Sequence, residues 1–104
     1  MRLRRRRFGD VIERQLTFFV DDDSDLLDDV ARALERYNGA DRDEAEELYG
    51  DYQLAIEAAT DRLAELRDAY ARTLPEPEAE MYEAEFNAAV VSRWRDLALT
   101  IEES

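Results

Sequence analysis

Apolar residues recur at helical spacing through most of the chain, and the longest such pattern runs over residues 41–73. The apolar positions of this stretch and of the residue after it are Ala45, Leu48, Tyr52, Ala55, Ala59, Leu63, Leu66, Tyr70 and Leu74. Their steps of three and four residues average about 3.6, the period of an undistorted α-helix, whereas a coiled-coil seam repeats at about 3.5. The pattern therefore predicts a long, nearly straight amphipathic helix that packs in a bundle.

Local features mark both ends of this helix. Asp41 is placed to cap its first turn, and Glu44 completes an Asp-x-x-Glu box three residues later. Pro75 and Pro77 cannot continue it. Gly50 lies inside the pattern, where it costs about 1 kcal/mol relative to alanine. We expect a continuous helix that another element crosses closely at Gly50, with a break at this residue as the alternative.

Three shorter helical patterns cover residues 2–20, 25–37 and 77–102. Their short connections favour antiparallel neighbours. The expected fold is all-α: an elongated four-helix bundle built on a long antiparallel helical hairpin, about 41–73 and 77–102, with two shorter N-terminal helices docked on it. The long helix spans about 50 Å at about 1.5 Å per residue, which is too long for a spherical domain of this size.

The segment Asp21–Asp25 separates the first two patterns. Ser24 is the expected N-cap of the second helix, and the surrounding carboxylates suit the positive end of the helix dipole. The alternative use of these carboxylates is a Ca²⁺ or Mg²⁺ site, although the run lacks the glycine and distal glutamate of an EF-hand loop. At the other end of this helix, Gly39 suits a left-handed residue after the last turn.

The two longest patterns share a broad apolar end. If the chain turns near residue 76, residues 48–59 lie beside residues 93–104 in an antiparallel pair. Both stretches are apolar on more than one face, and a partner is expected to dock there unless the N-terminal helices cover them. The candidate interface residues are Tyr49, Tyr52, Leu54, Trp94, Leu97 and Leu99.

Composition excludes several kinds of chemistry. The 104 residues include no Cys, His or Lys. Without Cys there is no disulfide, thiol nucleophile or thiolate metal site, and without His the commonest transition-metal ligand and general base are missing. The lack of Lys excludes Schiff-base chemistry and a P-loop lysine. We therefore expect no cofactor, and the sequence identifies no small-molecule substrate.

The net charge of −13 is unevenly distributed. Residues 1–7 form a basic arm, either flexible or folded back, and residues 8–104 form a single acidic helical domain with nine arginines and 27 acids, a net charge of −18. The arm contains Arg2, Arg4, Arg5, Arg6 and Arg7. Such an arm can contact the phosphates of nucleic acid or an anionic membrane, but the nearby acidic body favours its folding back on its own chain.

Hydropathy gives an expectation for the compartment. No apolar run approaches the roughly 18 residues that a membrane-spanning helix needs. The basic start resembles the first part of a signal peptide, but acidic and basic residues interrupt the stretch that would have to be its apolar core. A cytoplasmic location is expected.

Four carboxylates of the long pattern, Glu44, Glu47, Glu65 and Asp68, form an ExxE…ExxD arrangement. This arrangement resembles the motif of the all-α nucleoside triphosphate pyrophosphohydrolases of the MazG type. The resemblance implies that these four residues hold Mg²⁺ and that diphosphate is released from a nucleotide. On one continuous helix, Glu47 and Glu65 are about 27 Å apart, so the site requires a break at Gly50 or a second, antiparallel copy.

These observations predict a non-catalytic module for protein–protein interaction or scaffolding, which acts through self-association or by docking to a protein partner. Two alternatives stay open. One is an Mg²⁺-dependent nucleotide pyrophosphohydrolase that uses the four carboxylates. The other is contact with nucleic acid or an anionic membrane through the arginine arm.

Overall fold

The structure, a computed structural model, describes residues 7–104 and is all-helical over this range, so the expected all-α class is confirmed. In chain order the elements are α1 (Gly9–Asp22), α2 (Ser24–Asn38), α3 (Ala45–Ala71), α4 (Glu76–Arg93), the short 3-10 helix η1 (Arg95–Leu97) and α5 (Ala98–Glu103). In this part of the chain, no helix has the length and apolar character that crossing a membrane requires.

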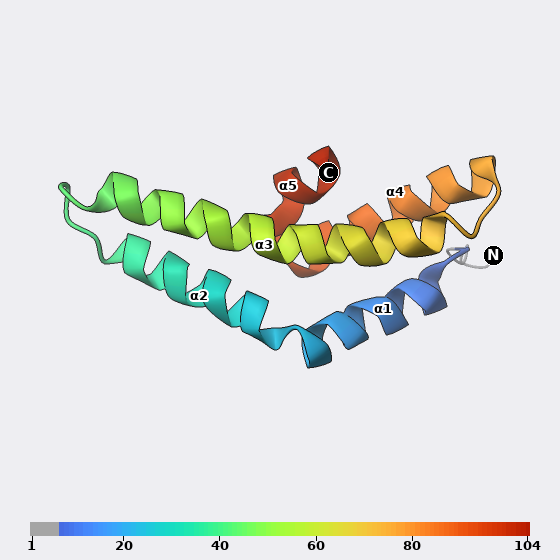
Figure 1. The fold of residues 1–104 in the computed structure, drawn as a ribbon, viewed down its shortest axis with the longest axis horizontal. Helices are drawn as coiled ribbons and strands as arrows, with labels where there is room; N and C mark the ends of the chain where they lie inside the picture. Colours follow the sequence, from blue (N-terminus) through green and yellow to red (C-terminus); the bar gives the residue numbers. More distant parts are fainter. Residues whose placement is uncertain (1–6) are drawn as a thin grey trace, which may run out of the picture.

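Helix α3 forms the long axis of the molecule (Figure 1). α2 lies antiparallel beside the first half of α3, and α4 lies beside its second half, next to α1 (Figure 1). The principal extents are 53 × 32 × 24 Å, an elongated shape that agrees with the length of the central helix. The end of the molecule that contains the α2–α3 loop consists of these two helices alone (Figure 1). We call it the two-helix end.

Helix α3 is continuous through Gly50, as expected. A methyl group added to Gly50 would meet no atom of another element within 4 Å, so the expected close crossing by another part of this chain is wrong. The helix begins at Ala45, later than predicted. The predicted cap by Asp41 is therefore wrong, because Glu44 is the N-cap residue of α3 and no side chain caps the helix. Asp41 Oδ1 instead accepts a hydrogen bond from the backbone N–H of Glu44 at 3.1 Å in the preceding turn.

The cap predictions for α2 are wrong in detail. Ser24 is the first residue of the helix, and no side chain caps it. Asp23 precedes it, but its carboxylate accepts a bond from Arg62 of α3 at 3.0 Å, which ties the α1–α2 corner to α3. Gly39 has φ −96°, so it is not left-handed. Its N–H bonds to the carbonyl of Glu35, and this closes the helix without a left-handed residue.

The predicted fourth helix over residues 77–102 is interrupted at Trp94, where φ is −137° and ψ is 91°. η1 and α5 leave the line of α4 and pack on both α3 and α4 (Figure 1). The break lets Leu97 and Ile101 enter the core, while the Trp94 ring packs edge to face on Phe19 with centroids 5.6 Å apart. A straight helix would carry Leu97 and Ile101 out along the two-helix end, away from this core.

An aromatic cluster links α1, α3 and α4. Tyr82 is fully buried at its centre, with ring centroids 5.5 Å from Phe8, 4.8 Å from Tyr70 and 5.9 Å from Phe86. Its hydroxyl donates a hydrogen bond to Oε1 of Gln15 at 2.8 Å. The polar tip of this core residue is therefore satisfied, as buried hydroxyls generally are.

The Tyr82 hydroxyl is expected to limit stability at high pH. Burial raises the pKa of Tyr82 from 10.0 to about 12. Because the folded protein holds the proton more tightly than the unfolded chain, this group stabilises the fold below pH 10, and the contribution is lost as the pH rises through about 12. We expect the free energy of unfolding in urea to fall less steeply over this window in Tyr82→Phe than in the native protein. The exposed Tyr49→Phe serves as the control, and identical pH profiles for the native protein and Tyr82→Phe would contradict the prediction.

Candidate functional site

A groove opens between the first half of α3 and the η1–α5 turn. We call it the tyrosine groove. It is lined by Tyr49, Tyr52, Gln53, Ile56 and Glu57 of α3 and by Arg95, Asp96, Leu99 and Thr100 of η1 and α5. Its volume of about 230 Å³ is smaller than the roughly 300 Å³ at which typical small-molecule sites begin. The size suits one or two anchoring side chains of a larger partner.

The groove exists because α4 stops before it reaches the first half of α3. Tyr49, Gln53 and Ile56 recur at helical spacing and so lie on one side of α3. Further along the same side, Thr60 and Arg67 are buried where α4 and α5 cover the helix. Since α4 ends at Arg93, it leaves this side of α3 uncovered over its first turns, and within residues 7–104 Glu46, Tyr49 and Gln53 are exposed there.

A row of three tyrosines lies at the groove. The ring centroids of Tyr37 and Tyr49 are 5.3 Å apart, and those of Tyr49 and Tyr52 are 6.3 Å apart, both pairs tilted. Tyr49 is 44% exposed. Burial and the nearby carboxylate of Asp96 raise the pKa of Tyr52. The row offers apolar ring faces together with hydroxyls that can form hydrogen bonds.

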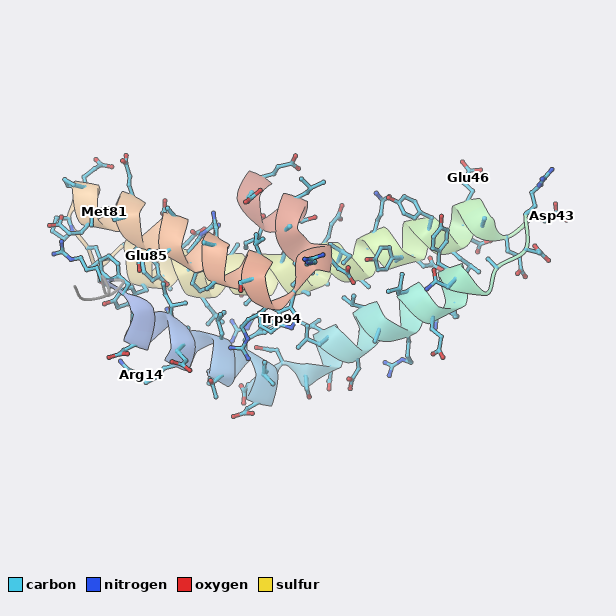
Figure 2. The ribbon with its side chains drawn as sticks, turned by 180° about the vertical axis from the view of Figure 1, so that it is seen from behind. Arg14, Asp43, Glu46, Met81, Glu85 and Trp94 are labelled. Carbon is cyan, nitrogen blue, oxygen red and sulfur yellow. The ribbon has the colours of Figure 1, made fainter. Side chains whose placement is uncertain are left out.

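The surroundings of the groove are acidic. Glu57 and Asp96 are part of its lining, and Arg95 is its single basic lining residue. Glu46 lies seven residues before Gln53, hence on the same side of α3, and Figure 2 shows it projecting away from α2. Residues 24–57 contain eleven acidic residues and three arginines, a net charge of −8. The two-helix end therefore attracts cations and repels anions.

The structure brings together three of the six candidate interface residues. Tyr49, Tyr52 and Leu99 line the groove, and Leu99 is 73% exposed. Leu54 is 65% exposed but lies five residues after Tyr49, about 140° further around the helix, and so faces another side.

The other two candidates belong to the interior. Leu97 is buried in the core, so its assignment to an interface is corrected. Trp94 is half-buried against Phe19, and its ring also lies 5.0 Å from the guanidinium of Arg93. Both side chains pack inward because the backbone breaks at Trp94, which periodicity alone did not predict.

The four candidate metal ligands are not gathered within one copy of the chain. Glu44 directly precedes α3, and the other three lie along this continuous helix, with Glu47 and Glu65 about 27 Å apart. Glu65 accepts a bond from Arg62, and Asp68 accepts one from Arg67. Across residues 7–104 no group of three or more His, Cys, Asp or Glu side chains is placed to hold a metal ion.

Of the arginine arm, Arg2, Arg4, Arg5 and Arg6 lie outside the described residues. Arg7 is exposed, lies 3.8 Å from the carboxylate of Glu78 and has its guanidinium 5.7 Å from the Phe8 ring centroid. Glu78 belongs to the first turn of α4, so Arg7 lies at the end of the molecule opposite the two-helix end (Figure 1).

Arg67 is a structural residue that periodicity did not identify. It is 5% exposed and binds the side-chain oxygens of Asp68 and Asn87 at 2.8 and 3.0 Å. It also donates to the backbone carbonyls of Ile101 and Ser104 at 3.4 and 3.2 Å. These bonds hold the end of α5 against α3 and α4, and α5 forms one wall of the tyrosine groove.

Several groove residues were also not predicted as part of a site. Nothing in the sequence pattern distinguishes Gln53 and Asp96 from ordinary polar residues on a solvent-exposed helix side. Tyr37, which lies beside the groove, falls at helical spacing with Val30 and Leu34 in the 25–37 pattern, and that spacing was the available clue. Its pairing with Tyr49 depends on how the two helices meet, which the linear sequence does not specify.

No protein-family model matches the chain, and no curated protein and no solved structure is significantly similar to it. A function therefore has to be inferred from the chemistry of the groove. Tyrosine rings, an exposed leucine and carboxylates supply contact area, hydrogen bonds and negative charge. These are the means of binding another polypeptide.

Proposed function

We propose that the protein is a non-catalytic interaction or scaffolding module, which acts through self-association or by docking another protein on the tyrosine groove. The observation that carries the proposal is the uncovered side of α3 in the two-helix end. Tyr49 lies exposed on this side, and the exposed Leu99 of α5 lines the same groove. Exposed apolar groups gathered in one place and rimmed by polar residues are typical of protein-binding surfaces.

The same proposal gives a finer description of the architecture. With α4, η1 and α5 taken as one broken element, the chain is an elongated four-helix bundle built on an α3–α4 hairpin, with α1 and α2 docked on it. The break at Trp94 removes the fourth element from the two-helix end. In this description, the tyrosine groove is the place in the bundle that a partner fills.

The test is photo-crosslinking in the cells that make the protein. A photoreactive amino acid replaces Gln53, whose exposed side chain lines the groove. The matched control places it at the exposed Leu54, on another side of the same helix. We expect a discrete polypeptide adduct from position 53 and none from position 54. Mass spectrometry then distinguishes a second 12.1 kDa copy from a different protein. No polypeptide adduct from position 53, or the same adducts from both positions, would overturn the proposal.

A further inference from the structure

We infer that the occupant of the tyrosine groove is a basic amphipathic helix of a partner protein, which places aliphatic and cationic side chains between α3 and α5. This inference rests on the proposed function and specifies the chemistry of the partner. It is carried by the shape of the uncovered surface, by the aromatic row and by the charge around it.

The shape fits a short helix. α3 from Ala45 to Ile56 is twelve residues, about 18 Å long. Glu46, Tyr49 and Gln53 are exposed on its groove side, and η1 and α5 form the opposite wall near the buried Ile56. Three turns of a partner helix match that length, so the partner would take the position that α4 leaves at Trp94. Amphipathic helices commonly bind by laying their apolar side in such a groove. The pocket between Tyr52, Ile56 and Leu99 then receives an anchoring side chain.

The aromatic row favours a partner with both apolar and cationic groups. Tyr49 and Tyr52 present tilted rings instead of one flat apolar surface. A leucine or isoleucine side chain packs on such rings, and an arginine or lysine lies favourably over their faces through cation–π attraction. Amphipathic helices with basic flanks supply both kinds of group at positions three and four residues apart.

The acidic residues around the groove also favour a basic partner. Glu57 and Asp96 line opposite walls of the groove, and Glu46 projects from the same side of α3 two turns before Gln53. With a net charge of −8 over residues 24–57, an acidic partner would be repelled, and so would a nucleic acid. A basic partner gains attraction and faster association from the same field.

A second copy of the chain fits this surface less well. Apposing two such ends would bring together two segments that each carry a net charge of −8. Residues 1–7 carry five of the fourteen arginines, and Arg7 lies at the opposite end of the molecule, beside Glu78. Face-to-face pairing of two grooves therefore lacks charge complementarity.

The test uses a designed probe and the full chain. The probe is a fluorescein-labelled 18-residue helical peptide with leucines along one side and arginines on the other, titrated with protein and followed by fluorescence anisotropy. One comparison peptide has glutamate in place of arginine, and another keeps the composition but scatters the leucines around the helix. We expect binding of the arginine probe that weakens with salt, no binding of the glutamate peptide, and at least tenfold weaker binding of the scattered peptide.

Variants of the protein locate the binding. Tyr49→Ser and the double variant Glu57→Gln with Asp96→Asn are each expected to weaken binding of the probe about tenfold or more. Leu54→Ala is the control for the tyrosine, and Asp51→Asn, an exposed carboxylate about 160° around α3 from Gln53, is the control for charge. Both controls should bind like the native protein. All these positions are at the surface, and circular dichroism confirms that each variant is folded.

Three results would overturn the inference. The first is absence of probe binding. The second is equal binding by all variants, because the probe would then be attracted by the overall charge of the protein and would not occupy the groove. The third is a second copy in the groove. Light scattering would then give a multiple of 12.1 kDa that Tyr49→Ser returns to monomer. The proposed function survives these results if position 53 still gives a polypeptide adduct, and it fails with the inference if that adduct is absent.

Discussion

Replacing Arg67 with methionine is expected to lower the free energy of unfolding by about 3 kcal/mol and to release α5 from α3. Methionine keeps much of the apolar stem of the side chain but removes every hydrogen-bond donor. The carbonyl oxygen of Ser104 and the amide oxygen of Asn87 would then lose their arginine donor, and the buried carbonyl oxygen of Ile101 would keep only the N–H of Ser104. Buried acceptors without a donor cost more than the bond itself contributed.

Urea unfolding measures the stability of this variant, and hydrogen exchange of the α5 amides measures the local release. Arg72→Met is the matched control, because Arg72 is an exposed arginine on the turn that follows the same helix. Arg67→Lys is expected to recover little of the loss, since an ammonium group cannot reproduce the planar fork that binds several acceptors at once. A stability within about 0.5 kcal/mol of the native value, with unchanged exchange in α5, would contradict the assignment of Arg67 as the anchor of α5.

The second large effect is expected from Phe86→Ala, with a loss of about 4 kcal/mol in the free energy of unfolding. Phe86 is fully buried on α4, and its ring lies beside that of Tyr82 in the cluster that joins α1, α3 and α4. Its removal loses the transfer free energy of the ring and leaves a cavity between packed helices, which collapses only in part.

Chemical denaturation again provides the measurement, and Met81→Ala on the same helix provides the control. Met81 is exposed, so its truncation should cost within about 0.5 kcal/mol. A loss below about 2 kcal/mol for Phe86→Ala would mean that the helices close over the cavity, and that the aromatic cluster is less rigid than its close ring contacts suggest.

Helical periodicity was sufficient to predict the elements that carry the core. The stripe that includes Leu63 and Tyr70 lies on the inner side of α3, and Tyr82 and Phe86 were placed on the inner side of the last helical pattern. The continuity of α3 through Gly50 was also predictable, because a single glycine costs less than the packing of a long periodic segment contributes.

The last helix shows where periodicity fails. Tyr82, Phe86, Val90, Leu97 and Ile101 are buried, and their spacing is compatible with a straight helix through residue 102. The break at Trp94 is decided by where those side chains find partners, since a straight continuation would have no core to enter. The same break exposes the groove side of α3, so the candidate site could be predicted only in part: Tyr49, Tyr52 and Leu99 were named, but not the wall that brings them together.

The sequence by itself determined the all-α class, the approximate helix positions, the uneven charge and the absence of Cys, His and Lys chemistry. These properties follow from composition and from spacing over a few residues, which act locally along the chain. The tertiary structure alone decided that Arg67 is buried, that Leu97 is core and that Tyr49 and Asp96 line one groove. Those outcomes depend on which helix faces cover one another, and burial energy is shared among residues that lie far apart in the sequence.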